Sequence, residues 1–250
     1  MTSLSLQQLA LLGAGAALGG IIFGVMGFAY GVVISVFLHH GFAASDVVFI
    51  VVGGALLLNV GLLPRFWRDI RWGEAVPYLA GAALGLPLGL WLLGSLDLRT
   101  IRAFVAVVII AYGLFALRRH ARAPFRFARA HGHAVDGFVG FLGGVIGGIC
   151  GLGPLVPGVW FGLRGLDKVR QRALAQPVGL CMQGFMVAWL LASSAVSRDA
   201  LEGLAIATPI MLAGAWLGVH GFDRLSTPIF RRGVVMLAIV GAGVLLARQF

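Results

Sequence analysis

The residues best suited to bind a solute form one glycine-rich apolar segment in the middle of the chain. Residues 143–157 read GGVIGGICGLGPLVP, in which six residues are glycine and two are proline. The dipeptide Gly153-Pro154 indicates a helix start, because proline is tolerated at the first helical position, where its missing N–H would have no partner. A helix start presents free N–H groups and the positive end of the helix dipole, which together bind anions. The predicted anion-binding residues of this segment are Gly148, Cys150, Gly151, Leu152, Gly153 and Pro154.

A second copy of the pattern lies 124 residues earlier. Residues 18–28 read LGGIIFGVMGF and align with LGGVIGGICGL at 142–152, with six identities in register. The equivalent helix start falls near Ala29-Tyr30, and the Tyr30 hydroxyl is expected to face the same cavity. Two opposed helix starts make an anion site without a formal charge. From this copy we expect Gly24, Gly27, Phe28, Ala29 and Tyr30 to contribute to the site.

Amide side chains within apolar segments are the next candidates. Asn59 and Gln183 occupy matching positions under the 124-residue offset, and Gln176 precedes Pro177, which matches Gly53. Amides in the middle of a membrane more commonly bond one helix to another than contact a ligand. The symmetric placement favours a binding role, so we expect the three amides to line the cavity, with interhelical bonding as the alternative.

Other kinds of chemistry have little support in the sequence. His39 and His40 are adjacent, so on a helix they point apart, and no further ligand is spaced to complete a metal site. Neither a Walker lysine motif nor a dinucleotide-binding glycine pattern occurs. The aspartates cluster at segment ends, where they are typical helix caps. We therefore expect no cofactor, no metal and no enzymatic activity.

The composition is that of a polytopic membrane protein. Of the 250 residues, 60% are hydrophobic and only 11% are charged, whereas soluble proteins are usually about 45–50% apolar. The formal net charge is +10, but the basic residues lie between apolar segments rather than on a soluble basic face with stacking aromatics. The lipid bilayer is therefore the expected surrounding, and nucleic acid is excluded as a partner.

Eight apolar segments account for nearly the whole chain. One crossing needs about 20 residues, which suits three segments in each copy. The opening segments, 8–38 and 134–163, are too long for one crossing and too short for two. Their glycines favour a re-entrant pair of half-helices that enters and leaves the membrane on the same side. The predicted crossings are 46–63, 75–94 and 101–118 in the first copy, and 172–194, 199–221 and 230–247 in the second.

The positions of Lys and Arg favour the re-entrant arrangement. If both opening segments crossed, the 19 basic residues would divide ten to nine between the two sides. If both re-enter, the division is fifteen to four, the asymmetry that the positive-inside rule expects. An odd number of crossings per copy then inverts the second repeat (134–250) relative to the first (1–118), with a basic cytoplasmic connector at 119–133. Inverted repeats with broken helices are typical of secondary transporters.

The second glycine segment also resembles a known family. The stretch from Gly148 to Pro157 is similar to the Gly-Ile-Gly-Gly-Gly-x-Leu-x-Val-Pro signature of TauE/SafE sulfite exporters, with matches that include Gly148, Gly151 and Pro157. The segments GAALG at 81–85 and GAWLG at 214–218 also look like the family. The resemblance covers essentially the whole chain. It implies a secondary exporter of sulfite or a small organosulfonate in a bacterial inner membrane.

Departures from the family pattern concern the lining of the expected site. Cys150, Leu152 and Pro154 stand where the signature has two glycines and a leucine. The small hydroxyl pair usual in the following span is replaced by AQP at 175–177.

The sequence thus predicts an all-α integral membrane protein of two inverted repeats, each a re-entrant helical hairpin plus three transmembrane helices. It is expected to transport a small sulfur-containing anion by alternating access. The alternatives are another small anion, such as thiosulfate or a carboxylate, and a non-transporting membrane scaffold. Proton coupling is left open and would run through the anion itself, a carboxylate at a segment end or His39-His40. Homodimer formation is also left open.

Overall fold

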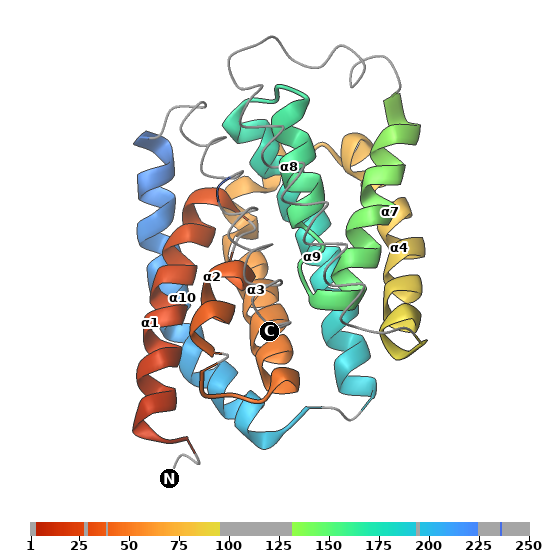
Figure 1. Ribbon diagram of the computed structural model, residues 1–250. Helices are drawn as coiled ribbons and strands as arrows, with labels where there is room; N and C mark the ends of the chain where they lie inside the picture. Colours follow the sequence, from red (N-terminus) through yellow and green to blue (C-terminus); the bar gives the residue numbers. More distant parts are fainter. Residues whose placement is uncertain are drawn as a thin grey trace. The chain divides into compact units, whose positions relative to one another are not determined.

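The computed structural model describes residues 4–27, 30–38, 40–95, 132–193 and 196–224, together with residue 236. Every regular element within these residues is helical (Figure 1). The predicted crossings 101–118 and 230–247 and nearly all of the connector 119–133 lie outside the described residues. The elements are α1 (Leu6–Met26), α2 (Tyr30–Leu38), α3 (Ala44–Phe66), the short 3-10 helix η1 (Trp67–Asp69), α4 (Trp72–Ser95), α7 (Gly132–Cys150), α8 (Leu155–Leu163), α9 (Lys168–Ala192) and α10 (Arg198–Arg224).

Six of the described helices are long and apolar enough to cross a membrane. They are α1, α3, α4, α7, α9 and α10. Their outward surfaces carry large apolar side chains that a soluble protein would bury, among them Leu84, Trp91 and Trp216, which are 72%, 64% and 62% exposed. Such side chains are stable on the outside only against lipid. The protein is therefore an all-α integral membrane protein.

The duplication in the sequence is also a duplication of helices. Adding 124 to the bounds of α2 gives 154–162, and α8 spans Leu155–Leu163. Adding 124 to the bounds of α3 gives 168–190, and α9 spans Lys168–Ala192. In the same way α7 corresponds to α1, and α10 corresponds to α4. Each repeat thus begins with a long helix followed by a helix of nine residues.

In the first repeat, α1 and α2 form an antiparallel hairpin. Gly19 of α1 lies against the ring of Tyr30, and Gly15, one turn nearer the start of α1, lies against Ile34 of α2. The chain returns to the beginning of α1, where the Gln8 Nε2 donates to the backbone oxygen of Gly41 at 2.7 Å. The two open ends of this hairpin therefore lie together.

The expectation that each hairpin consists of two half-helices is wrong for its first helix, which is long in both repeats. Helix α1 has 21 residues and α7 has 19, and only α2 and α8 are short. The glycines inside α1 do not end the helix, because they let another helix approach closely. Cβ atoms added at Gly20 and Gly24 would overlap the backbone oxygens of Met211 and Ala215 in α10. This close packing offsets the low helix propensity of glycine.

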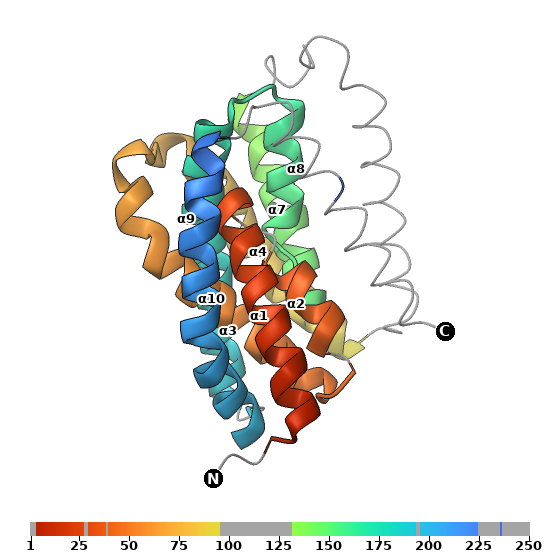
Figure 2. The ribbon, with the colours of Figure 1, turned by 90° about the vertical axis from the view of Figure 1, so that its left-hand side faces the viewer.

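The chain divides into two compact units. Unit 1 comprises Met1–Arg65 and Gly179–Leu225, and unit 2 comprises Phe66–Val178 and Ser226–Phe250. In unit 1, α1 lies along α10, and the two are side by side in both views (Figure 1, Figure 2). In unit 2, α4 packs along α7. Each unit therefore pairs the opening helix of one repeat with a later helix of the other repeat.

Small residues form the α4–α7 contact in unit 2. Cβ atoms added at Gly81, Gly85 and Gly89 would overlap the backbone of α7. In unit 1, Gly214 and Gly218 of α10 lie equally close to the backbone of α1. These glycines serve close helix packing, because a side chain there would force the helices apart.

Candidate functional site

The two hairpin turns are built in the same way. Gly27 ends α1 with φ 86°, and its N–H donates to Phe23 O at 2.7 Å. Gly151, its equivalent 124 residues later, follows α7 with φ 75°, and its N–H donates to Gly147 O at 2.8 Å. A left-handed residue after a helix is most readily glycine, since a Cβ there is strained. The predicted site residues Gly27 and Gly151 therefore determine the shape of each turn. Phe28 and Ala29 lie outside the described residues.

The N-terminus of α8 is less available to an anion than the sequence predicts. Helix α8 begins at Leu155, directly after Pro154. The N–H groups of Leu155 and Val156 donate to Leu152 O at 3.1 Å and Gly153 O at 3.3 Å, and Pro154 lacks an N–H. The expectation that the first turn of α8 offers free N–H groups is thus wrong for these residues, because the turn carbonyls accept from them. The positive end of the helix dipole remains.

Tyr30 is the predicted site residue with the most distinctive surroundings. It is the first residue of α2 and is fully buried in unit 1, with its ring between Gly19 of α1 and Gly54 of α3. A Cβ added at Gly54 would lie 2.7 Å from the Tyr30 hydroxyl oxygen. Within the described part of the chain this hydroxyl has no hydrogen-bond partner. A buried polar group without a partner costs about 1–3 kcal/mol, so the hydroxyl is suited to accept or donate to a solute.

The structure brings Asn59 and Gln183 together. Asn59 Nδ2 donates to Gln183 Oε1 at 2.6 Å and to Ala55 O at 3.0 Å, and both amides are buried in unit 1. The opposite orientation of the Gln183 amide would let its nitrogen donate to Ala55 O and Gly179 O, each at 3.2 Å. The interhelical bond that the sequence offered as an alternative is therefore present, between α3 and α9.

Asn59 and Gln183 are also equivalent positions of the two repeats, exactly 124 residues apart. Gly54, which faces the Tyr30 hydroxyl, precedes Asn59 on α3 by five residues, or about 7.5 Å along the helix axis. Unit 1 thus holds three buried polar side chains at α3: Asn59 and Gln183 bond to each other, and Tyr30 lies against α3 about 140° around the helix from Asn59.

The other predicted site residues are placed differently. Gly24 lies in the α1–α10 contact, and its equivalent Gly148 lies in the α7–α4 contact, where a Cβ would be 2.7 Å from Leu86 O. Helix packing accounts for both of these glycines. Gln176 is fully buried in the part of α9 that belongs to unit 2. Cys150 is the last residue of α7.

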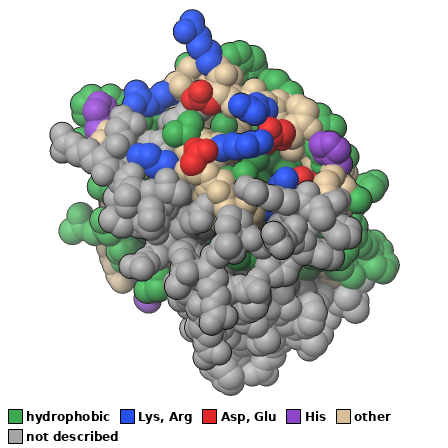
Figure 3. All heavy atoms as spheres, turned by 90° about the horizontal axis from the view of Figure 1, so that it is seen from above, with side chains coloured by type: hydrophobic (Ala, Val, Ile, Leu, Met, Phe, Trp, Pro, Cys, Tyr) green, Lys and Arg blue, Asp and Glu red, His purple; other side chains and the backbone are tan. Residues whose placement is uncertain are grey.

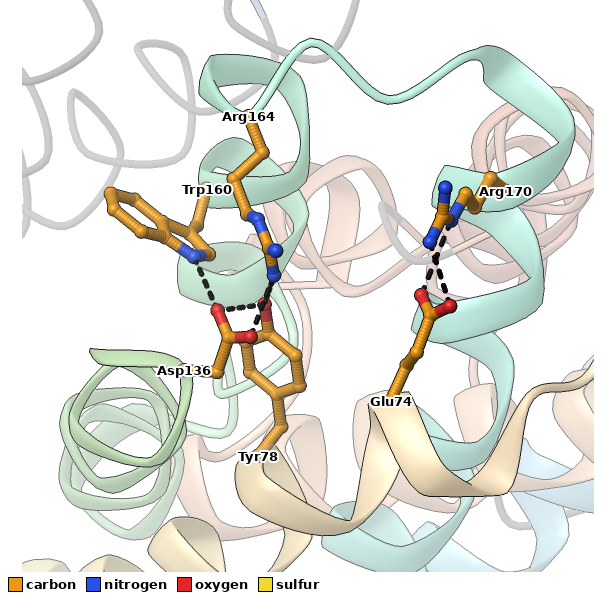
Figure 4. A network of polar contacts seen from close by, with 6 residues as sticks. All are labelled: Glu74, Tyr78, Asp136, Trp160, Arg164 and Arg170. Carbon is orange, nitrogen blue, oxygen red and sulfur yellow. Dashed lines mark hydrogen bonds and ion pairs between the residues drawn. The ribbon is translucent and has the colours of Figure 1, made fainter. Parts of the chain in front are cut away.

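A polar cluster in unit 2 was not predicted from the sequence (Figure 4). Its centre is the buried carboxylate of Asp136 in α7. Asp136 Oδ1 accepts from the Tyr78 hydroxyl at 2.5 Å and from Trp160 Nε1 at 3.0 Å, and Oδ2 accepts from Arg164 Nη1 at 2.6 Å. Arg164 Nη1 also donates to the Tyr78 hydroxyl at 3.3 Å. The sequence assigned Asp136 to a helix cap and Arg164 to topology.

One signal in the sequence was available for this cluster. Trp160 and Arg164 are four residues apart, which places both on one face of α8. Nothing in the local sequence indicates that Tyr78 and Asp136, which are 58 residues apart, meet on that face. Burial alone would lower the pKa of Arg164, but its hydrogen bonds to Tyr78 and Asp136 and the charge of Asp136 raise it. The guanidinium is therefore a permanent cation.

A second ion pair lies at the same end of unit 2. Arg170 of α9 donates to both carboxylate oxygens of Glu74 in α4, at 2.7 and 3.2 Å (Figure 4). Seen from above, basic and acidic side chains lie next to one another on this end, and hydrophobic side chains lie at the margin (Figure 3). The charged end of unit 2 is consistent with a membrane surface rather than a lipid-facing wall.

Comparison with known proteins agrees with this architecture. A family model described as sulfite exporter TauE/SafE matches residues 11–245. The chain is 29% identical over 175 residues to a protein of Comamonas testosteroni called "Probable inner membrane transporter protein TsaS", and the alignment covers 69% of this chain and 71% of that protein. No solved structure matches the chain. With six apolar helices among its described residues, the chain is a multi-pass inner-membrane protein, and the proteins it matches are membrane transporters. It belongs to the sulfite exporter TauE/SafE family.

Proposed function

We propose that this protein exports sulfite or a small organosulfonate by alternating access, and that the solute binds in unit 1 beside Tyr30, Asn59 and Gln183. The observation that carries the proposal is the Tyr30 hydroxyl, buried at the start of α2 without a hydrogen-bond partner among the described residues. Membership of a sulfite exporter family supports the substrate class.

The chemistry of the three side chains suits a sulfur oxyanion. Sulfite and sulfonates present several acceptor oxygens on one sulfur atom, and the site offers the phenolic O–H of Tyr30 and the amide N–H groups of Gln183. Both N–H groups of Asn59 donate to Gln183 and Ala55, so Asn59 orients the Gln183 amide. The N-terminus of α2 adds the positive end of a helix dipole, worth about 0.3–1 kcal/mol when exposed and up to about 2 kcal/mol when partly buried. None of these donors carries a formal charge. A solute held by dipoles rather than by an ion pair can leave again, as export requires.

Inverted repeats with hairpins that enter and leave on the same side remain our proposal for the membrane topology. Two observations support it: Gln8 bonds to Gly41 at the open end of the first hairpin, and Asp136 bonds to Trp160 at the open end of the second. Exchange of helices between the repeats in both units is also consistent with a symmetric transporter. Irregular backbone such as the two turns is tolerated inside a membrane where it faces protein or a water-filled cavity.

The test is transport by purified protein in liposomes. Saturable flux of sulfite or a short alkylsulfonate is expected, with thiosulfate and acetate as competing anions. Tyr30→Phe should lower the flux, because it removes one hydroxyl and keeps the ring. Ser35→Ala is the matched control, since the Ser35 hydroxyl, also on α2, donates to Val32 O within its own helix.

Each outcome has a definite meaning. If the protein prefers thiosulfate or acetate, it is still a transporter, but its substrate is one of the alternative anions rather than sulfite or a sulfonate. If no anion shows saturable flux, transport is refuted, and the remaining alternative is a non-transporting membrane scaffold. Equal flux in the Tyr30→Phe and Ser35→Ala variants would show that the Tyr30 hydroxyl does not bind the solute.

A further inference from the structure

We propose that the Asp136 cluster, made of Tyr78, Asp136, Trp160 and Arg164, is a latch that holds α8 in place and opens during each transport cycle. This inference rests on the proposed function. It assigns these side chains a positioning role, because they act on the movement of a helix and not directly on the solute.

The latch joins three helices through one carboxylate. Tyr78 comes from α4, Asp136 from α7 and Trp160 from α8, and Arg164 is the capping residue that follows α8 (Figure 4). Helix α8 has nine residues, so it is about 13 Å long and acts as a short rod. One end of the rod is the hairpin turn, and the other end is held by the latch. A shift of α8 relative to α4 and α7 therefore has to break the bonds that Arg164 and Trp160 donate to Asp136 and the bond that Arg164 donates to Tyr78.

The charges of the latch suit a contact that opens and closes. Asp136 is buried, whereas 24% of the Arg164 side chain is exposed. Buried ion pairs contribute little net stability, but their hydrogen bonds demand one geometry, so they define position rather than strengthen the fold. Partial access of Arg164 to water lowers the barrier to separation, because the guanidinium is solvated as it leaves.

Only one of the two hairpins has this latch within the described residues. Subtracting 124 from Asp136, Trp160 and Arg164 leads to Leu12, Val36 and His40, so the central carboxylate has no equivalent in the first hairpin. Adding 124 to Tyr78 leads to Glu202, which pairs with Arg198 of its own helix. The first hairpin is instead closed by the Gln8–Gly41 bond, between two neutral groups. The two hairpins, otherwise built alike, are therefore held by contacts of different chemistry, neutral in the first and charged in the second.

The sequence indicates the side of the membrane on which the latch lies. Helix α7 begins at Gly132, within the last residues of the basic connector 119–133, and Arg170 pairs with Glu74 at the same end of unit 2. By the positive-inside rule this end faces the cytoplasm. The geometry thus points to a gate that controls access from the cytoplasm.

The first experiment locks the latch. In a variant with Cys150 and Cys181 replaced by Ala, Tyr78→Cys and Arg164→Cys are introduced together and bridged by a short bifunctional methanethiosulfonate reagent, each end of which forms a disulfide with one thiol and releases methanesulfinate. Bridging should abolish sulfite flux, leave sulfite affinity within about twofold because the site in unit 1 is not altered, and be reversed by reduction. Each single-cysteine variant treated with the same reagent is the control. Unchanged flux in the bridged protein would overturn the latch.

The second experiment does not depend on transport. Asp136→Asn should increase amide hydrogen exchange of α8 by at least about tenfold, while α2 serves as an internal reference in the same molecule. Asp69→Asn, the same chemical change on the exposed helix η1, is the control. Unchanged exchange in α8 would refute the latch even if wild-type protein transports sulfite. Failure of wild-type flux, with increased exchange in α8, would instead refute the proposed function.

Discussion

Replacing Tyr30 by Phe should stabilise the protein without solute and weaken its binding of solute. The hydroxyl is buried beside Gly54 and lacks a partner among the described residues. Phenylalanine keeps the ring between α1 and α3, so the packing contacts remain. The two effects have opposite signs and come from the same oxygen atom.

The expected magnitudes follow from the burial of this group. An unsatisfied buried donor costs about 1–3 kcal/mol, and Tyr30→Phe removes that cost. At about 2–4 °C per kcal/mol for a chain of this size, the melting temperature should rise by several degrees. In the presence of an oxyanion the same hydroxyl contributes a charge-assisted hydrogen bond of about 1.5–3 kcal/mol. Its loss weakens the affinity for sulfite by about tenfold to 150-fold.

The assay is thermal unfolding in detergent with and without sulfite, combined with equilibrium binding. Without sulfite, the variant should unfold at a higher temperature than wild type. Addition of sulfite should raise the unfolding temperature of the variant by less than it raises that of wild type. Ser35→Ala, which removes a hydroxyl bonded to its own helix, should change neither the affinity nor the gain. A Tyr30→Phe protein that is less stable without sulfite and binds it normally would refute the reasoning, because the hydroxyl would then have a structural partner.

Three further outcomes are expected. Gly85→Ala should destabilise the protein by about 1–3 kcal/mol, because its methyl group would overlap the α7 backbone, whereas Gly73→Ala, with open space around its Cα, should not; thermal unfolding compares them. Gly151→Ala should cost about 1–2 kcal/mol, measured in the same way, since φ is 75° there. Asn59→Ala and Gln183→Ala should each reduce flux, and a double-mutant cycle on stability should give a coupling of about 0.6 kcal/mol; additive effects would mean that the amides act separately.

The sequence by itself determined the features that depend on local chemistry. Apolar composition required a membrane protein, and the 124-residue repeat predicted that helices would recur at equivalent positions. The start of α2 at Tyr30 and of α8 after Pro154 follows from glycine and proline, whose backbone preferences act within a few residues. The left-handed glycine that ends each opening helix belongs to the same class of local effect.

Tertiary structure decided which surfaces meet, because that depends on residues far apart in the chain. Gly24 occupies a helix contact rather than the solute site, because α10 packs against it. Asp136 forms a cluster rather than a cap, because α4 and α8 bring Tyr78 and Arg164 to its carboxylate. Local sequence preferences act over a few residues, whereas these contacts join residues up to about 190 positions apart, so only the packed helices could reveal them.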